Sequence, residues 1–320
     1  MTAEPAGAAS GLETFKLSDG RRLAYHVYGA PLQGAAQRAV LYFHGVPSCH
    51  MEAEALHGAA KALGLPVVSM DRAGIGLSDF KCCRGLATTA DDARQLALHL
   101  ALQRLVLVGT SGGGPYAAAF AALHPQGVEA LVLVSAVGPT DWAHLPLLRA
   151  MHGADFLQLG LVRLPPLGGL WALHSLLGYM AKHHTQTLLE HAPEGMAAAD
   201  AQVLRSDPAV RHAFGACLRH AYCRGARGMA RDVRVLGGKW GVSLSDIQCR
   251  VMIWQGDQDR SVPVAHALWW AQQVPGSQLT VLPGEGHVTV LLRHAAAILE
   301  AAVHGAQQQP QQEAAQQPPG

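Results

Sequence analysis

Short apolar runs alternate along the chain with segments of helical periodicity. The first run, Arg22–Tyr28, alternates apolar with polar residues after a turn at Ser18–Gly20, a pattern typical of an antiparallel hairpin strand. Most of the later runs are apolar throughout, as is typical of strands that are covered on both faces. These later runs are Ala39–Phe43, Pro66–Met70, Leu105–Gly109, Ala130–Ser135, Val251–Gln255 and Gln278–Leu282.

Segments with helical patterns separate these predicted strands. They are Glu52–Leu63, Thr89–Leu102, Pro115–Leu123, Val264–Gln273 and Val288–Val303. Strands and helices that alternate in this way predict an α/β fold, in which helices flank a mostly parallel sheet and the crossovers are right-handed.

The alternation stops after Ser135. Residues 139–222 are rich in Leu, His and Ala, helical in pattern, and without a convincing strand. Because this stretch is too long for a loop, we predict a helical cap at 139–222, inserted into a core made of 12–138 and 223–304. Residues 1–11 and the Gln/Pro-rich residues 305–320 are predicted to be disordered, since they cannot bury enough apolar surface.

Composition narrows the class of protein. Hydrophobic residues make up 49% of the chain and charged residues 15%, which favours a large buried core. The net charge is +1 and the basic residues are scattered, so we expect no nucleic-acid partner. The six cysteines lack a regular spacing and are expected to be free thiols. The N-terminus resembles neither a signal peptide nor a transit peptide, which predicts a cytoplasmic protein.

The most apolar long stretch is Phe156–Met180, which Arg163, two prolines and two glycines interrupt. A membrane-spanning helix needs about 20 largely uninterrupted apolar residues, so no transmembrane segment is expected. A weak contact of this part of the cap with a membrane surface stays open as an alternative.

The segment Leu105–Pro125 carries the most chemical information. An apolar strand leads into a G-x-S-x-G pattern centred on Ser111, and an Ala-rich helix follows. A serine on such a sharp strand-to-helix turn presents its hydroxyl at the sheet edge, while glycine at 109 and 113 avoids steric clashes. The helix also directs its N-terminal amides toward charge that develops near Ser111. This context predicts a nucleophilic serine.

Four landmarks in order resemble the α/β-hydrolase superfamily: HGVP at 44–47, DRAGIGLSD at 71–79, GTSGGGP at 109–115, and a late Asp and His. The resemblance covers roughly Leu12 to His304. Within the superfamily, the S-G-G-G-P elbow is similar to that of a group of uncharacterised, esterase-like hydrolases.

The resemblance implies roles for individual residues. Asp259 in the G-x-x-D-x-x-V-P pattern would be the acid, with Asp257 as the alternative, and His287 would be the general base. The oxyanion hole would use the amides of Gly112 and Val46, the latter with an uncertainty of one residue. We interpret His44 as a residue that stabilises its loop.

A serine at the elbow predicts an acyl-enzyme route, most simply the hydrolysis of small apolar carboxylic esters. Thioesters, amides and carbon–carbon bonds fit as well, as do a membrane-surface lipase and a ligand-binding receptor with slow turnover. An acyl pocket could be lined from the cap, although each candidate residue is more simply explained by packing. The candidates are Leu145, Leu147, Leu148, Phe156, Leu157, Trp171, Leu176, Leu177, Tyr179 and Met180.

We expect no cofactor and no metal. DRAGIGLSD lacks the third glycine and the helix of a dinucleotide site. The pair Cys49–His50 and the histidines at 183, 184 and 191 lack zinc-type spacing, and no HExxH motif occurs. The expected partner is therefore a small-molecule ester alone, and the oligomeric state is left open.

Overall fold

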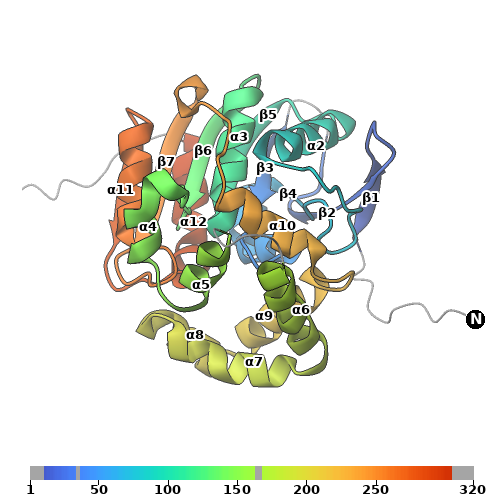
Figure 1. Cartoon of the computed structure of the whole chain (residues 1–320). Coiled ribbons are helices and arrows are strands. Elements are labelled where there is room, and N and C mark those ends of the chain that lie inside the picture. Colours follow the sequence, from blue (N-terminus) through green and yellow to red (C-terminus); the bar gives the residue numbers. More distant parts are fainter. Residues whose placement is uncertain (1–10, 34–36, 163–167, 305–320) are drawn as a thin grey trace, which may run out of the picture.

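The structure is a computed structural model that describes residues 11–33, 37–162 and 168–304. An eight-stranded sheet in the order β1-β2-β4-β3-β5-β6-β7-β8 runs through the molecule (Figure 1). Its strands are β1 (Glu13–Lys16), β2 (Arg22–Gly29), β3 (Arg38–Phe43), β4 (Pro66–Met70), β5 (Arg104–Thr110), β6 (Val128–Val134), β7 (Arg250–Gly256) and β8 (Gln278–Leu282). The pairs β1–β2 and β2–β4 are antiparallel and all the other pairs are parallel, which confirms the predicted fold class.

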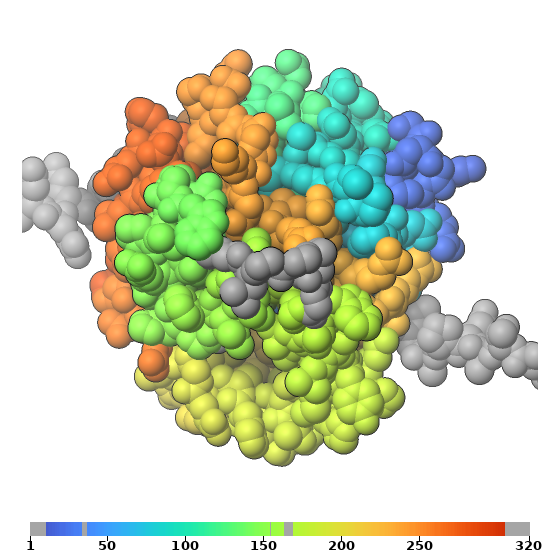
Figure 2. Space-filling view, in the orientation of Figure 1, coloured from blue at the N-terminus to red at the C-terminus, as the bar shows by residue number. Residues whose placement is uncertain are grey.

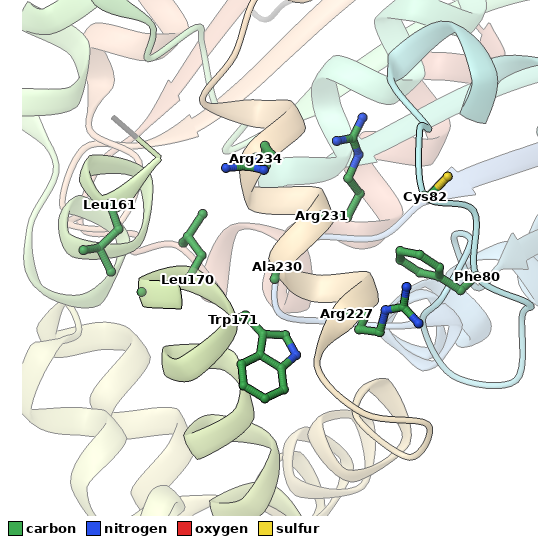
Figure 3. A pocket seen from close by; sticks show the side chains of 10 residues that line it. Phe80, Cys82, Leu161, Leu170, Trp171, Arg227, Ala230, Arg231 and Arg234 are labelled. Carbon is green, nitrogen blue, oxygen red and sulfur yellow. The ribbon is translucent and has the colours of Figure 1, made fainter. Parts of the chain in front are cut away.

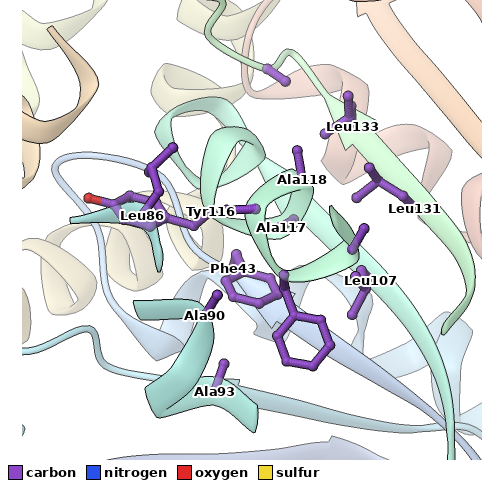
Figure 4. Close-up of a cluster of buried hydrophobic side chains, with 14 of the residues drawn as sticks. Phe43, Leu86, Ala90, Ala93, Leu107, Tyr116, Ala117, Ala118, Leu131 and Leu133 are labelled. Atoms are coloured by element: carbon purple, nitrogen blue, oxygen red, sulfur yellow. The ribbon is translucent and has the colours of Figure 1, made fainter. Parts of the chain in front are cut away.

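Both faces of the sheet are covered, because successive side chains of its apolar strands enter two different hydrophobic clusters. In β5, Leu105 and Leu107 belong to one cluster, whereas Val106 and Val108 belong to the other. Figure 4 shows part of the first cluster, in which Ala117 and Ala118 lie against the sheet. This two-sided burial is the reason that the strands are apolar throughout rather than alternating.

Helices form the two outer layers and the connection between β6 and β7. They are α1 (His57–Ala62), α2 (Leu86–His99), α3 (Gly114–Leu123), α4 (Leu145–Ala150), α5 (Gly153–Leu161), α6 (Gly168–His183), α7 (Thr185–His191), α8 (Ala198–Ser206), α9 (Pro208–Ala221), α10 (Arg227–Leu236), α11 (Val264–Gln273) and α12 (Thr289–His304). Helices α2, α3, α10 and α11 contribute to the first cluster, and α1 and α12 to the second.

The residues from 139 to 222, called the cap segment below, form helices joined by short non-helical connections wherever the structure describes them, and no strand lies among these described residues. Helices α6 to α9 gather at the bottom of Figure 1, and Figure 2 shows this green-to-yellow surface below the core. The division of the chain into core and cap stays a prediction. No helix in the described ranges combines the length and the apolar character that crossing a bilayer requires. Of the residues predicted to be disordered, 1–11 and 305–320, all but Gly11 lie outside the described residues.

Three elements differ from their predictions, and one of them is α10, for which the sequence predicted no helix. The first arm of the hairpin, β1, was not expected as a strand because ETFK is short, largely exposed and without an apolar run. The single helix expected at Glu52–Leu63 is a 3-10 helix, η1 (His50–Leu56), followed by α1. At the start of η1, the amide of His50 donates to the side chain of Asp71 (2.9 Å), a tertiary contact that no local helical pattern reveals.

Candidate active site

Ser111 occupies the strand-to-helix turn after β5 that the sequence predicts. Its φ of 53° lies in the left-handed region, a conformation that non-glycine residues adopt only under local constraint. A Cβ on Gly113 would lie 1.9 Å from the carbonyl oxygen of Phe43, and one on Gly109 would lie 2.8 Å from the Cβ of Ala117. Both glycines are therefore required by the close approach of the elbow to β3 and α3.

His287 and Asp259 come together from the loops after β8 and β7. The Nδ1–H of His287 donates to Oδ2 of Asp259 at 2.8 Å. The carboxylate of Asp259 is buried, and it also accepts from the amide of Val262 (2.8 Å) and from Nε2 of Gln255 (3.2 Å). These bonds hold the carboxylate in place and orient the imidazole, so that Nε2 is left for proton transfer.

Ser111 and His287 line the same cavity, which has a volume of about 450 Å³. Within the described ranges, no hydrogen bond joins the Ser111 hydroxyl to the imidazole. Such bonds are often long in the free enzyme and tighten only when substrate binds. The structure therefore brings the three predicted residues to one site, with the imidazole–carboxylate pair formed and the serine–imidazole bond unmade.

The loop after β3 lies against the elbow. The amide of Gly45 donates to both carboxylate oxygens of Glu52 (3.0 and 3.1 Å), so it is unavailable to a substrate. Val46 packs against Gly112, since a Cβ on that glycine would lie 3.0 Å from Cγ2 of Val46. Val46 is thus the better candidate for the first oxyanion donor, together with Gly112.

A buried ion pair holds this loop from below. The guanidinium of Arg72, from the DRAGIGLSD segment, donates to the carbonyl oxygens of His44 and Gly45, the latter at 2.8 Å. Asp232 on α10 accepts from Arg72 at 2.7 Å and also pairs with Arg84. The segment that superficially resembled a nucleotide motif is therefore a support for the candidate oxyanion loop.

The contacts of His44 agree with its interpretation as a residue that stabilises its loop, and the contact of Asp257 indicates a turn residue. His44 is fully buried, and its Nδ1 lies 2.9 Å from the carbonyl oxygen of Gly45. Burial, with help from the Arg72 charge, lowers the pKa of His44 to about 3, so it is neutral and binds its own loop. Asp257 is exposed and accepts from the amide of Gly284 at 2.7 Å, which is a turn-stabilising contact.

Sequence reasoning missed two carboxylates that the cap segment contributes. Asp155 on α5 lines the same cavity as Ser111 and His287. Asp200 on α8 is buried and accepts from the backbone amides of His287 (2.7 Å), Val288 (3.0 Å) and Thr289 (2.9 Å). Asp200 therefore caps the N-terminus of α12 from another helix and fixes the loop that carries the imidazole.

The charge around His287 is strongly negative. Burial by itself lowers the pKa of His287, but the carboxylate of Asp259 outweighs it. With the further contributions of Asp155 and Asp200, the pKa of His287 rises to about 9. The free site thus favours the imidazolium at neutral pH, and a general base must first lose that proton.

The predicted acyl-pocket residues of the cap do not line the Ser111 cavity. Leu147 and Leu148 are buried in packing, whereas Trp171 and Leu176 are more than half exposed. The apolar wall comes instead from α9 and α12. Its members include Val210, Ala213, Phe214, Leu218, Leu291 and Leu292. For Leu147 and Leu148 this agrees with packing, the simpler explanation, and it shows that apolar content alone does not reveal which cap helix faces the core.

A second cavity of about 320 Å³ lies beside α10, and Ser111 is not among the residues that line it. Figure 3 shows Leu170 and Trp171 of α6 beside Ala230 of α10, the helix that also carries the arginines at 227, 231 and 234. Arg227 lies over the ring of Phe80, with 4.3 Å between the guanidinium carbon and the ring centroid, and Arg231 donates to the carbonyl of Arg84. Arg227 and Arg231 are thus engaged in packing α10 against the segment that contains Phe80 and Arg84.

Comparison with known proteins agrees with this geometry. Residues 38–293 match the family model described as the alpha/beta hydrolase fold, and the chain belongs to this family. An uncharacterised protein of Mycobacterium tuberculosis is 30% identical over 276 residues, which are 85% of this chain and 75% of that protein. A 2-hydroxy-6-oxononadienedioate/2-hydroxy-6-oxononatrienedioate hydrolase of Pseudomonas putida is 28% identical over 71% of this chain and 72% of its own length. An esterase of Exiguobacterium antarcticum shares the fold, with a TM-score of 0.63 and 20% identity over 90% of this chain and 98% of the esterase.

The contact between Asp200 and the His287 loop gives a first prediction. Asp200→Ala removes a charged acceptor from three amides and should lower the free energy of unfolding by about 2 kcal/mol or more. It should lower kcat more than it changes KM, since the imidazole loses its fixed position. A Cβ on Gly286 would lie 2.2 Å from Oδ2 of Asp200, so Gly286→Ala should also destabilise.

In the double variant the clash is gone, so the two losses should not add. Urea unfolding of the two single variants and the double variant measures whether the losses in the free energy of unfolding add. Asp246→Asn, an exposed position in η5, is the control. Additive losses, or a kcat that Asp200→Ala leaves unchanged, would contradict the role of Asp200.

The raised pKa of His287 gives a second prediction. The rate of ester hydrolysis, as kcat/KM, should rise with pH toward about 9, because only the neutral imidazole accepts the proton of Ser111. Asp155→Asn removes a negative charge, disfavours the imidazolium and lowers the pKa of His287. A pKa lower by one raises kcat/KM at pH 7 about tenfold. If the profile of kcat/KM against pH is unchanged in Asp155→Asn, or moves to higher pH, Asp155 does not raise the pKa of His287.

Proposed function

We propose that this α/β hydrolase is a serine hydrolase that acts through an acyl-enzyme. The observation that carries the proposal is the constrained Ser111, which lines one cavity with a His287 that is already bonded to Asp259. A hydroxyl at an elbow, an imidazole and a buried carboxylate are the parts that nucleophilic acyl transfer needs.

Each step follows from these parts. The neutral imidazole takes the proton of Ser111 as its oxygen attacks the substrate carbonyl, and Asp259 stabilises the imidazolium that forms. The amides of Val46 and Gly112 donate hydrogen bonds to the developing oxyanion. The imidazolium then gives its proton to the leaving alcohol, and water activated by His287 hydrolyses the acyl-enzyme.

The cavity favours small apolar esters. Its wall includes Val210, Phe214 and Leu291, and no lysine or arginine is among the residues described around it. Its acidic lining residues are Glu52, Glu54 and Asp155, and the imidazole of His287 is the one basic group among the residues described around it. A neutral acyl group can enter such a cavity, whereas an added carboxylate would meet three acidic side chains against a single imidazolium that catalysis must deprotonate.

Carbon–carbon bond hydrolysis is a second candidate, because the similar protein of Pseudomonas putida is named a hydrolase of 2-hydroxy-6-oxononadienedioate, a keto acid without an ester bond. The substrate in that name is a dioate, a molecule that carries two carboxylates. No lysine or arginine lines the described Ser111 cavity, so the two carboxylates of a dianion would have only the His287 imidazole as a basic partner, and a dianion is disfavoured here. We therefore propose carboxylic ester hydrolysis as the activity of this chain.

The identity of the nucleophile can be tested directly. A fluorophosphonate probe should label the wild type and fail to label Ser111→Ala, and kcat for p-nitrophenyl butyrate should fall by about 10⁶-fold in that variant. Ser261→Ala is a matched control, since Ser261 lines the same cavity but does not lie at the strand-to-helix turn after β5. Equal labelling of the wild type and Ser111→Ala, or loss of labelling in Ser261→Ala alone, would refute the assignment.

Substrate class is tested with neutral and charged acyl groups of matched length. We expect kcat/KM to rise up to about fourfold for each added methylene from acetate to butyrate, because each buries more apolar surface. A p-nitrophenyl monoester of succinate should react at least about tenfold more slowly than the butyrate ester. Phe214→Ala should flatten the chain-length trend, and Arg219→Ala, an exposed change on the same helix, should not. A preference for the charged ester would favour the dioate-type alternative.

A further inference from the structure

A compact group of metal-ligating side chains lies outside the candidate active site. The ligand atoms of Cys49, His50, Asp71 and His220 all lie within 4.8 Å of one another. Asp71 is fully buried, with His50 Nδ1 at 2.9 Å from its Oδ1 and His220 Nε2 at 2.9 Å from its Oδ2. Cys49 and His50 are buried as well, and His220 is only partly exposed.

The fold makes room for this group. A Cβ on Gly76, whose φ is 52°, would lie 1.9 Å from Oδ2 of Asp71 and 2.6 Å from Nε2 of His220. Only glycine therefore allows the DRAGIGLSD segment to pass so close to both ligands. The rings of His50 and His220 also meet edge to face, with their centroids 4.7 Å apart.

We propose that Cys49, His50, Asp71 and His220 bind one divalent transition-metal ion, and that this ion is zinc. One thiolate, two imidazoles and one carboxylate complete a tetrahedral zinc site, with bonds of about 2.0 to 2.3 Å. A carboxylate with imidazole ligands and a thiolate suits zinc better than magnesium or calcium, which prefer oxygen alone. Four protein ligands leave no open position, so the site is structural rather than catalytic.

Hydrogen bonding to Asp71 explains why His50 and His220 lie beside that carboxylate, but it does not explain why the thiol of Cys49 lies there too. The sulfur of Cys49 is buried beside them. It lies 3.4 Å from the sulfur of Cys217 and 3.5 Å from the carbonyl oxygen of Cys217. A metal ion gives this sulfur a role, since coordination displaces its proton to solvent and turns a weakly bonded thiol into a ligand. The sulfur of Cys217 lies next to the group as part of its surroundings.

The ligands come from two parts of the chain that are far apart in sequence. Cys49 and His50 lie at the start of η1 and Asp71 follows β4, whereas His220 lies near the end of α9 in the cap segment. The other end of α9 carries Val210 and Phe214 into the Ser111 cavity. A bound ion would therefore fix the position of the helix that forms one wall of that cavity, whatever reaction occurs there.

Metal binding can be tested without an activity assay. Untagged full-length protein is treated with a chelator, dialysed and titrated with Co²⁺, which replaces zinc and absorbs visibly. We expect one Co²⁺ per chain with a thiolate-to-metal charge-transfer band. Zn²⁺ should displace it and raise the melting temperature by about 5 °C at roughly 100 times its Kd.

Variants locate the ion. Cys49→Ser should abolish the charge-transfer band, and His220→Gln, which keeps a donor for Asp71, should weaken Co²⁺ binding at least about tenfold. Cys249→Ser, a partly buried thiol elsewhere, and His212→Gln, an exposed histidine on the same helix, should match the wild type. If Cys49→Ser does not fold, His220→Gln decides alone. No bound metal, or Co²⁺ spectra and affinities that are the same in the wild type and in His220→Gln, would overturn the proposal.

Discussion

The site depends on how closely the elbow approaches the end of β3. No side chain fits at Gly113, where a Cβ would lie 1.9 Å from the carbonyl oxygen of Phe43. This contact places Ser111, the amide of Gly112 and the loop that carries Val46 within one small volume at the carboxyl end of the parallel strands. The constrained φ of Ser111 is the local cost of that arrangement, and the packed sheet below supports it.

Buried charge does the remaining positioning. Asp232 holds Arg72, and Arg72 holds the carbonyl groups of the loop beside Ser111. On the opposite side, Asp200 holds the amides of the loop that carries His287. Asp200 lies on α8, so the cap segment takes part in aligning the imidazole besides covering it. If the proposed ion is present, it adds a second link between the cap segment and the core.

Local sequence signals were sufficient for most of the core because its strands and elbow carry strong patterns. β4, β8 and α11 begin and end where their apolar periodicity predicts, and β1 was missed because it is short and exposed. Asp259 and His287 were found through the order of motifs along the chain. In contrast, no motif marks Asp155 or Asp200, since each acts from a cap helix on a loop far away in sequence.

The sequence by itself determined the fold class and the strand-to-helix turn at Ser111, and it predicted Asp259 and His287 as the partners of that serine, since burial on two faces and tight turns restrict which residues fit locally. The tertiary structure alone decided which cap helix forms the apolar wall of the cavity, because α9 is less apolar than α5 and α6 and only packing selects it. It also decided that Cys49, His50, Asp71 and His220 converge. Their spacing in sequence hides this, because a site built from three separate segments has no local periodicity to read.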